Sequence, residues 1–275
     1  MRSPDRRSLL AAALLLVPLL APSARAAELY LSGNLGIAFA KGDVDYSNSL
    51  SPDLSTSGSD GDNSPIYGGA LGMSFPLREL LPWRLRIPSF DVPYFPGRAW
   101  HVTGSEDWRF PGWRTQFEIE AQTGRDFDLV TDGPSPLTPQ VSNIKSSSFM
   151  FNTRLDVPIQ APLHVFFGRL PFLEPVTLYG GAGVGASLNE IESTDVTLGK
   201  DSDSGFTMAY QFKAGFGYAL TDRIHLSLGY RYYDLGKLDV GFGAGNTAEV
   251  TAKLISHDFT SGISVYFYRI PFLGE

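Results

Sequence analysis

The sequence predicts an all-β fold, an eight-stranded antiparallel transmembrane β-barrel built as an up-and-down meander. Three observations predict it. Many segments alternate large apolar residues with small or polar ones, which is the period of a strand with two different faces. The 275 residues include 29 glycines and no cysteine. Beyond the N-terminal segment, no apolar stretch approaches the roughly 18 residues of a transmembrane helix.

The clearest alternation lies near the C-terminus. In "RIHLSLGYRYY" (223–233), large apolar residues at even positions alternate with polar or small residues at most odd ones. The preceding "GFTMAYQFKAGFGYAL" (205–220) alternates in the same way, and Thr221-Asp222 between them is typical of a tight hairpin turn. One apolar and one small or polar face suit a barrel wall that meets lipid on its outer side.

The same pattern recurs along the chain and predicts eight strands, each about as long as the nine to eleven tilted residues that cross the hydrocarbon core. The expected strands span residues 28–40, 65–76, 113–125, 147–158, 176–189, 205–220, 223–235 and 256–268.

The connections between these strands alternate in character. Four polar stretches rich in Asp, Ser and Gly are expected to be extracellular loops. They span residues 41–64, 126–146, 190–204 and 236–255. Two of the three intervening connections, 77–112 and 159–175, are rich in proline and aromatic residues. They are therefore expected to be long periplasmic connections instead of the usual short turns.

The N-terminus has the three parts of a secretory signal peptide. These are a basic start, an apolar stretch over 9–21 and Ala-Arg-Ala at 24–26. The alternative, a membrane anchor, needs a longer apolar stretch. We expect a cleaved signal peptide over 1–26, an outer-membrane barrel over 27–268 and a short tail over 269–275.

The charge balance narrows the class of partner. Without residues 1–26 the chain has 18 basic and 28 acidic residues, a net charge of −10. Nucleic acid, which attracts basic surfaces, is therefore not an expected partner.

The C-terminal segments resemble a known family. "TLYGGAGVGASLN", "FTMAYQFKAGFGYALTDRIHLSLGYRYYDLG" and the final "SHDFTSGISVYF" look like the last four strands of the opacity-type and OmpA-type outer-membrane barrels of Gram-negative bacteria. The resemblance spans residues 176–268 and implies an outer-membrane location, a lipid bilayer with lipopolysaccharide as surroundings, and insertion by the barrel-assembly machinery. Family members include adhesins, structural barrels and small channels, so the resemblance implies no single function.

The inward faces suggest how the lumen is filled. Placing the apolar faces outward puts four acidic and four basic residues inside: Arg114, Glu118, Glu120, Arg154, Asp156, Lys213, Arg231 and Asp258. Eight strands enclose a space that side chains just fill. Because lone buried charges are costly, we expect an ion-paired plug. The alternative is a narrow ion path lined by the same residues.

A short repeat marks the periplasmic strand ends. "RIPSF" (86–90), "RLPFL" (169–173) and "RIPFL" (269–273) each pair arginine with an apolar aromatic residue. Such residues suit the boundary between lipid headgroups and acyl chains. The expected interfacial anchors are Arg86, Arg169, Phe172, Arg269 and Phe272. Alternatively, these segments and residues 94–113 form a periplasmic collar that binds a partner.

No group of residues indicates a catalytic, cofactor or metal site. His225 and Ser227 have the spacing of the His-x-Ser pair of lipid A deacylases. Both, however, are expected in the lumen near the periplasmic turn, far from the outer leaflet. Asp60 and Asp62 fit no EF-hand loop, and "GGAGVG" at 180–185 lies within an expected strand instead of a phosphate-binding loop.

These observations predict a monomeric integral outer-membrane protein that is not an enzyme. Its expected role is structural or surface-contact, of the adhesin type, carried by acidic extracellular loops that meet a host surface or another envelope component. A small porin-like channel is the alternative, and a lipid A-modifying enzyme is a third reading.

Overall fold

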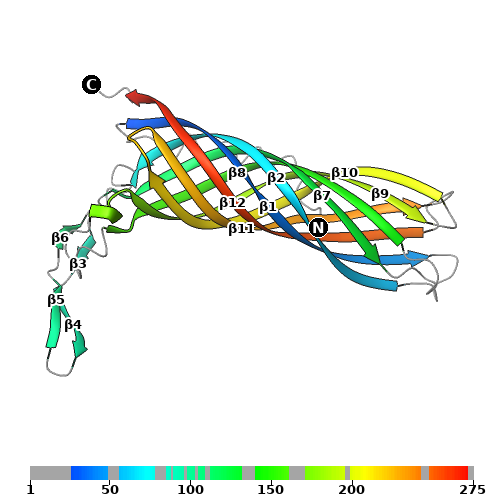
Figure 1. Ribbon diagram of the computed structural model, residues 1–275, viewed down its shortest axis with the longest axis horizontal. Coiled ribbons are helices and arrows are strands. Elements are labelled where there is room, and N and C mark those ends of the chain that lie inside the picture. The colour runs from blue at the N-terminus through cyan, green and yellow to red at the C-terminus, as the bar shows by residue number, and fades with distance from the viewer. Residues whose placement is uncertain are drawn as a thin grey trace, which may run out of the picture.

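Eight long strands close into a single antiparallel barrel, which confirms the predicted fold class (Figure 1). The computed structural model describes residues 26–48, 56–77, 85–87, 89–95, 98–102, 105–108, 112–131, 140–160, 171–195, 199–242 and 248–271. The barrel strands are β1 (Ala26–Asn48), β2 (Thr56–Pro76), β7 (Arg114–Thr131), β8 (Gln140–Pro158), β9 (Val176–Asp195), β10 (Gly199–Ala219), β11 (Ile224–Phe242) and β12 (Ala248–Pro271). β1 pairs with β12 and closes the barrel.

The two ends of the barrel differ. Ala26 and Pro271 pair at one end, which we call the termini end, while Asn48 and Ala248 pair at the other, which we call the loop end. All eight predicted strands are present, but most extend further toward the loop end than predicted. Most of the stretch 41–64, for example, belongs to β1 and β2.

The strands are longer than predicted because the hydrogen bonds between neighbouring strands continue where both faces of a strand are polar. Such a strand has no hydrophobic period for the sequence to reveal. At the termini end, β12 runs to Pro271, so the first residues of the predicted tail belong to the barrel. The predicted signal peptide lies outside the described residues except for Ala26.

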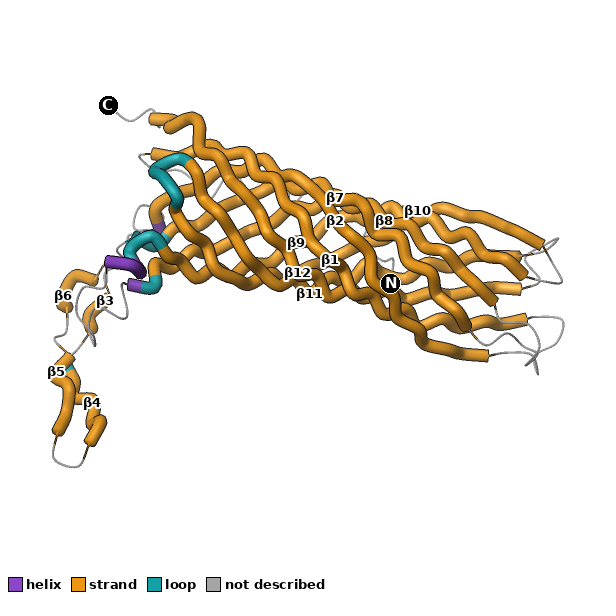
Figure 2. The backbone as a smooth tube through the Cα atoms, in the orientation of Figure 1, coloured by secondary structure: helices purple, strands orange, loops and turns teal. Residues whose placement is uncertain are grey.

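The connections at the termini end carry additional structure. Between β2 and β7, β3 (Leu85–Ile87) pairs with β6 (Ser105–Trp108), and β4 (Phe90–Phe95) pairs with β5 (Arg98–Val102). Figures 1 and 2 show these small sheets projecting to the side of the barrel. The β8–β9 connection contains the short 3-10 helix η2 (Pro171–Leu173). Among the described residues, no helix has the length and apolar character needed to cross a membrane.

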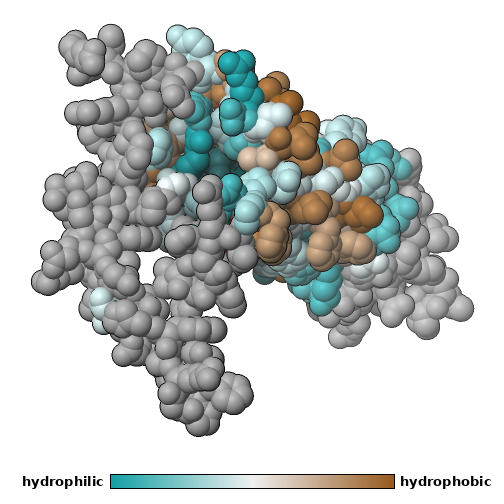
Figure 3. All heavy atoms as spheres, turned by 60° about the vertical axis from the view of Figure 1, so that its left-hand side comes forward, coloured by the Kyte–Doolittle hydropathy of each residue, from teal (hydrophilic) through white to brown (hydrophobic). Residues whose placement is uncertain are grey.

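The outer wall is apolar over the half nearer the termini end. Alternate residues of the strands expose large hydrophobic side chains there, among them Leu35, Leu71, Phe149, Phe212, Leu228 and Phe259. Figure 3 brings the termini end forward and shows hydrophobic residues gathered on the barrel wall. Continuous apolar surface of this extent marks contact with lipid.

Aromatic side chains form contacting pairs on the outer wall of β10, β11 and β12. The ring centroids of Tyr210 and Tyr232 lie 6.4 Å apart, and those of Tyr230 and Phe259 lie 5.5 Å apart. Beyond them the outward residues of β1 are polar, beginning with the exposed Lys41. Aromatic residues on the lipid-facing wall are typical of outer-membrane barrels.

Inside the barrel, the half nearer the loop end holds a buried hydrophobic cluster, which we call the apolar layer. All eight barrel strands contribute to it: Ala38, Ala40, Ile66, Phe127, Ile144, Met150, Ile191, Ala209, Tyr233, Leu235, Ala252 and Leu254. The half nearer the termini end is polar and holds the candidate site.

Candidate functional site in the barrel lumen

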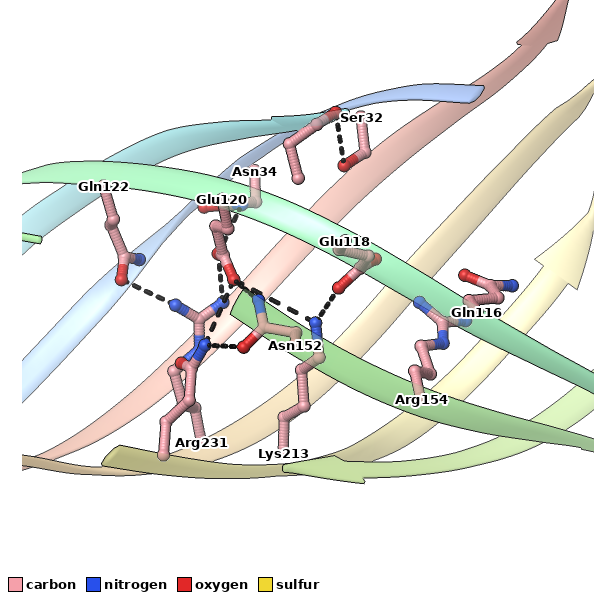
Figure 4. Close-up of polar contacts among 12 residues, drawn as sticks. Ser32, Asn34, Gln116, Glu118, Glu120, Gln122, Asn152, Arg154, Lys213 and Arg231 are labelled. Atoms are coloured by element: carbon pink, nitrogen blue, oxygen red, sulfur yellow. Dashed lines mark hydrogen bonds and ion pairs between the residues drawn. The ribbon is translucent and has the colours of Figure 1, made fainter. Parts of the chain in front are cut away.

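The lumen-facing residues of β7 form a polar ladder that runs from the termini end toward the apolar layer. In order along the strand they are Arg114, Gln116, Glu118, Glu120, Gln122 and Arg125. Figure 4 shows the central four, with partners from the facing strands. We call this ladder and its partners the polar layer.

Glu120 lies at the centre of the polar layer. Its Oε1 accepts hydrogen bonds from Arg231 Nη2 at 2.8 Å and Asn34 Nδ2 at 3.2 Å. Its Oε2 accepts from Asn152 Nδ2 at 2.8 Å and Gln211 Nε2 at 3.3 Å. Four donors match the roughly four lone-pair sites of a carboxylate. This buried charge is therefore both paired and fully hydrogen-bonded, which its burial requires.

One step closer to the termini end, Glu118 pairs with the ammonium of Lys213. The Tyr30 hydroxyl also donates to Glu118, at 2.7 Å. Lys213 lies 4.0 Å from Glu120 as well, so it links two steps of the ladder. The two carboxylates thus share cations from two facing strands.

At the mouth of the termini end, Arg114 pairs with Glu28. Near it, Arg154 Nε donates to Asp156 Oδ1 at 2.6 Å, and Gln116 also donates to Asp156. The guanidinium of Arg154 lies 3.9 Å from the ring centroid of Tyr179, a cation–π contact that favours the charged state.

At the deepest step, Arg125 and Asp258 form a pair whose side chains have no exposed surface. Their atoms Nη2 and Oδ2 lie 2.6 Å apart. Gln122 Oε1 accepts from both Arg125 and Arg231, at 2.9 and 2.6 Å. The guanidinium of Arg125 lies 4.4 Å from the ring centroid of Tyr233, which belongs to the apolar layer. This pair therefore marks the boundary between the two layers.

A β-bulge places Arg125 in the lumen. The register between β7 and β8 shifts between Gln122 and Arg125, and Gly124 has a φ of 96°, which glycine adopts without strain. The extra residue reverses the alternation, so Arg125 points inward instead of toward lipid. A Cβ on Gly124 would lie 2.8 Å from the carbonyl oxygen of Pro65.

The structure places the eight residues predicted for the lumen inside the barrel, where their ion pairs form three groups. Arg114 pairs with Glu28, Arg154 pairs with Asp156, and the remaining residues are linked in one chain: Glu118, Lys213, Glu120, Arg231, Gln122, Arg125 and Asp258. The prediction omitted two of their partners, Glu28 and Arg125. Glu28 has the same parity as Asn34 and the other inward residues of β1, so alternation extended to the strand start would have included it. Arg125 needed the bulge, for which a glycine inside a strand is the available sequence signal.

The polar layer encloses a small cavity of about 40 Å³. Charged residues of β7 and of other strands line it, including Glu118, Lys213 and Arg231. Small or hydroxyl residues of β1, β11 and β12 also line the cavity, among them Ser32, Ser227, Thr260, Gly262 and Ser264. This volume accommodates about three water molecules, at 10–15 Å³ for each.

The glycine-rich face of the wall is explained by close packing. A Cβ on Gly229 of β11 would lie 1.9 Å from the hydroxyl of Tyr179, and a Cβ on Gly183 would lie 1.8 Å from Asn152 Oδ1. Gly183 belongs to "GGAGVG", which lies within β9 as expected. Glycine at these positions leaves room for lumen side chains of nearby strands.

His225 and Ser227 lie on β11 near the termini end. The ring centroid of His225 is 4.7 Å from that of Tyr266, and Ser227 lines the cavity. Among the described residues, no group of three or more His, Asp or Glu could hold a metal ion.

Of the predicted interfacial anchors, Phe172 alone has a described side chain. It lies in η2 and is exposed. Arg86 belongs to β3 and Arg269 to β12, but their side chains are outside the described part. Arg169 and Phe272 lie outside the described residues altogether.

A closed antiparallel barrel with an apolar outer wall and an ion-paired lumen defines an integral β-barrel membrane protein. Residues 99–267, more than half of the chain, match the family model described as "Outer membrane protein beta-barrel domain". The chain belongs to this family, which places it in the outer membrane of a Gram-negative bacterium.

Solved structures with a similar architecture share little sequence with this chain. Neisserial surface protein A is 17% identical, with a TM-score of 0.39, over 88% of this chain and 99% of that one. OprG from Pseudomonas aeruginosa is 11% identical, with a TM-score of 0.44, over 89% and 98%. Ail, the attachment invasion locus protein of Yersinia pestis, is 12% identical, with a TM-score of 0.27, over 83% and 98%. No curated protein matches the chain.

Proposed function

We propose that this protein is a monomeric outer-membrane barrel with a closed lumen and a surface-contact role carried by its acidic loop end. The termini end faces the periplasm, and the loop end faces outward. The partner is a cationic surface, on a host cell or elsewhere in the envelope.

One observation carries this proposal. The four stretches 41–64, 126–146, 190–204 and 236–255 together contain fifteen acidic and five basic residues. Their net charge of −10 equals that of the whole chain without residues 1–26, so the remainder is neutral. A local excess of one sign steers and holds partners of the opposite sign, and salt weakens the effect.

Several of these acidic side chains are exposed on the outer surface of the strand ends. Asp43, Asp45, Asp126 and Asp128 are exposed on β1 and β7. Asn143 Nδ2 donates to Asp126 and Asp128 at 2.7 and 2.8 Å, which holds the two carboxylates side by side. Strand ends bonded into the sheet present these charges in a fixed arrangement.

The test replaces Asp43, Asp45, Asp126 and Asp128 by asparagine and measures adhesion of expressing cells to a surface coated with polylysine or extracellular-matrix protein. The matched control replaces the same residues by glutamate and keeps the charge. We expect weaker, less salt-dependent adhesion from the asparagine variant only, with heat-dependent gel mobility showing that both barrels fold. Equal adhesion by both variants would refute the proposal.

A second candidate, a small porin-like channel, is favoured by the polar cavity in the lumen. It predicts conductance steps in a planar bilayer that change when Glu118 or Lys213 is neutralised. A silent bilayer with a folded barrel supports the closed lumen.

We also propose that the protein is not an enzyme. His225 packs against Tyr266 inside the barrel, at the end opposite the proposed outer surface. A lipid A-modifying enzyme would change the mass of lipid A on expression, and the change would disappear on His225→Ala. Mass spectrometry of lipid A therefore tests this part of the proposal directly.

For the termini end we propose interfacial anchoring by Arg86, Arg169, Phe172, Arg269 and Phe272. Replacing the three arginines by glutamine should lower the stability of the barrel in vesicles. Unchanged stability together with the loss of a periplasmic partner would favour the collar instead.

A further inference from the structure

We infer that the lumen is a blind, water-filled half-channel that opens at the termini end and is sealed by the apolar layer. In this arrangement the ion pairs line a wet cavity, and the hydrophobic side chains form the barrier. The half-channel admits water and small inorganic ions. This inference is independent of the surface-contact role and uses only the geometry of the lumen.

Side-chain exposure along the polar layer gives the first argument. Arg114 at the mouth is 30% exposed, Arg154 13%, Lys213 10%, Arg231 5% and Arg125 0%. Their partners follow the same order, from 22% for Glu28 to 0% for Asp258. A steady fall from the mouth inward indicates that solvent enters from the termini end and stops at the Arg125–Asp258 pair.

Unpartnered polar atoms give the second argument. Among the described residues, Asn34 Oδ1 and Arg231 Nε are buried without a hydrogen-bond partner. Both residues line the cavity. An unsatisfied buried donor or acceptor costs about 1–3 kcal/mol, and water in a polar cavity of sufficient volume removes that cost. The cavity therefore suits water bound to its charged and hydroxyl-bearing lining residues.

The apolar layer gives the third argument. It begins directly beyond Arg125, with Phe127 on the same strand, and every barrel strand contributes a buried residue to it. Ile66, Phe127, Ile144, Ile191, Leu235 and Leu254 are each no more than 4% exposed. Apart from the hydroxyl of Tyr233, the side chains of this layer carry no polar group that could replace the hydration shell of an ion, so ions are excluded.

The test uses engineered thiols, because the chain has no cysteine. Ser227→Cys places a thiol in the cavity, and Ala209→Cys places one in the apolar layer. Each variant is refolded into lipid vesicles and exposed from outside to silver ions, which bind thiolates and are small enough for the lumen. After the silver is removed, trypsin cleavage between β2 and β7 identifies the molecules whose termini end faces outward.

The samples are then denatured with a polyethylene-glycol maleimide, which shifts the gel mobility of every thiol that silver left free. We expect silver to protect Ser227→Cys only in molecules cut between β2 and β7, and to leave Ala209→Cys unprotected in all molecules. Heat-dependent mobility before treatment shows that each variant has folded.

Each other result overturns the inference. Protection of Ser227→Cys in molecules with the loop end outward means that the lumen opens on that side. A lack of protection in every molecule means that the cavity is closed at both ends. Protection of Ala209→Cys means that the apolar layer is no seal. None of these results bears on the surface-contact role, which the adhesion experiment tests separately.

Discussion

The two halves of the lumen are built on the same strands but stabilised in different ways. In the polar layer, each described acidic residue has a cation within hydrogen-bonding distance, and most accept further hydrogen bonds, with Glu120 accepting four. In the apolar layer, side chains fill the same cross-section by volume alone. The comparison shows that an eight-stranded barrel can bury charged side chains where oppositely charged and hydrogen-bonding partners converge on them. It excludes water where the lumen is filled by apolar side chains instead.

This difference predicts the largest loss of stability at the deepest ion pair. Asp258→Ala leaves Arg125 as an uncompensated charge with no exposed surface, which should cost about 3–5 kcal/mol. Urea unfolding of the barrel in lipid vesicles measures the loss. The double variant Arg125→Met, Asp258→Leu should recover most of it, because apolar residues can replace a buried pair at little cost.

The exposed pair Lys41–Asp43, at 3.8 Å, serves as the control for that measurement. Asp43→Ala should leave the unfolding midpoint unchanged, since exposed pairs contribute little. If Asp258→Ala also left the unfolding midpoint unchanged, the Arg125–Asp258 pair would be solvated, and the contrast between the two layers would disappear.

In the apolar layer the expected cost comes from lost volume. Ile144→Ala removes a buried side chain that is 2% exposed, and should lower the free energy of unfolding by about 2–5 kcal/mol. Ile144→Val removes less and should cost about 0.5–1.5 kcal/mol. Both losses are measured by the same unfolding experiment. If Ile144→Ala and Ile144→Val lowered the free energy of unfolding equally, the apolar layer would be loosely packed, and the case for a seal would be weaker.

Close packing between nearby strands predicts a smaller effect at Gly229. Gly229→Ala would place a Cβ 1.9 Å from the Tyr179 hydroxyl, and overpacking of this kind costs about 1–3 kcal/mol. Because the clash is with the hydroxyl oxygen, Tyr179→Phe should rescue part of the loss. A double-mutant cycle without coupling would place the strain elsewhere.

Much of the barrel could be predicted from the sequence, because a wall with lipid on one side and a crowded lumen on the other imposes strict alternation. The strand ends beyond the membrane could not, since polar or small residues on both faces of β2 near Asp60 and Asp62 leave no period to detect. The four short strands between β2 and β7 were missed for a related reason. Segments of three to six residues are too short to show alternation.

The lumen network was predictable wherever alternation holds, as at Glu118, Glu120 and Lys213. The prediction from alternation failed at Arg125, because the bulge at Gly124 reverses which residues of β7 face the lumen. The division into two layers also escaped prediction, because periodicity separates inside from outside but does not show which inward residues share a level. Levels depend on strand tilt and stagger, which only the closed barrel determines.

The smallest effect is expected at the mouth, where the polar layer meets solvent. Arg114→Gln removes the partner of Glu28, but side chains that are 30% and 22% exposed remain hydrated. The loss should therefore be below about 1 kcal/mol and should shrink further as salt is raised. The unfolding of Arg114→Gln and of Asp258→Ala is measured at low and high ionic strength. This compares the most exposed ion pair of the polar layer with the most buried one. A salt-independent loss as large as that of Asp258→Ala would mean that the mouth is dry, and the half-channel would then have no entrance.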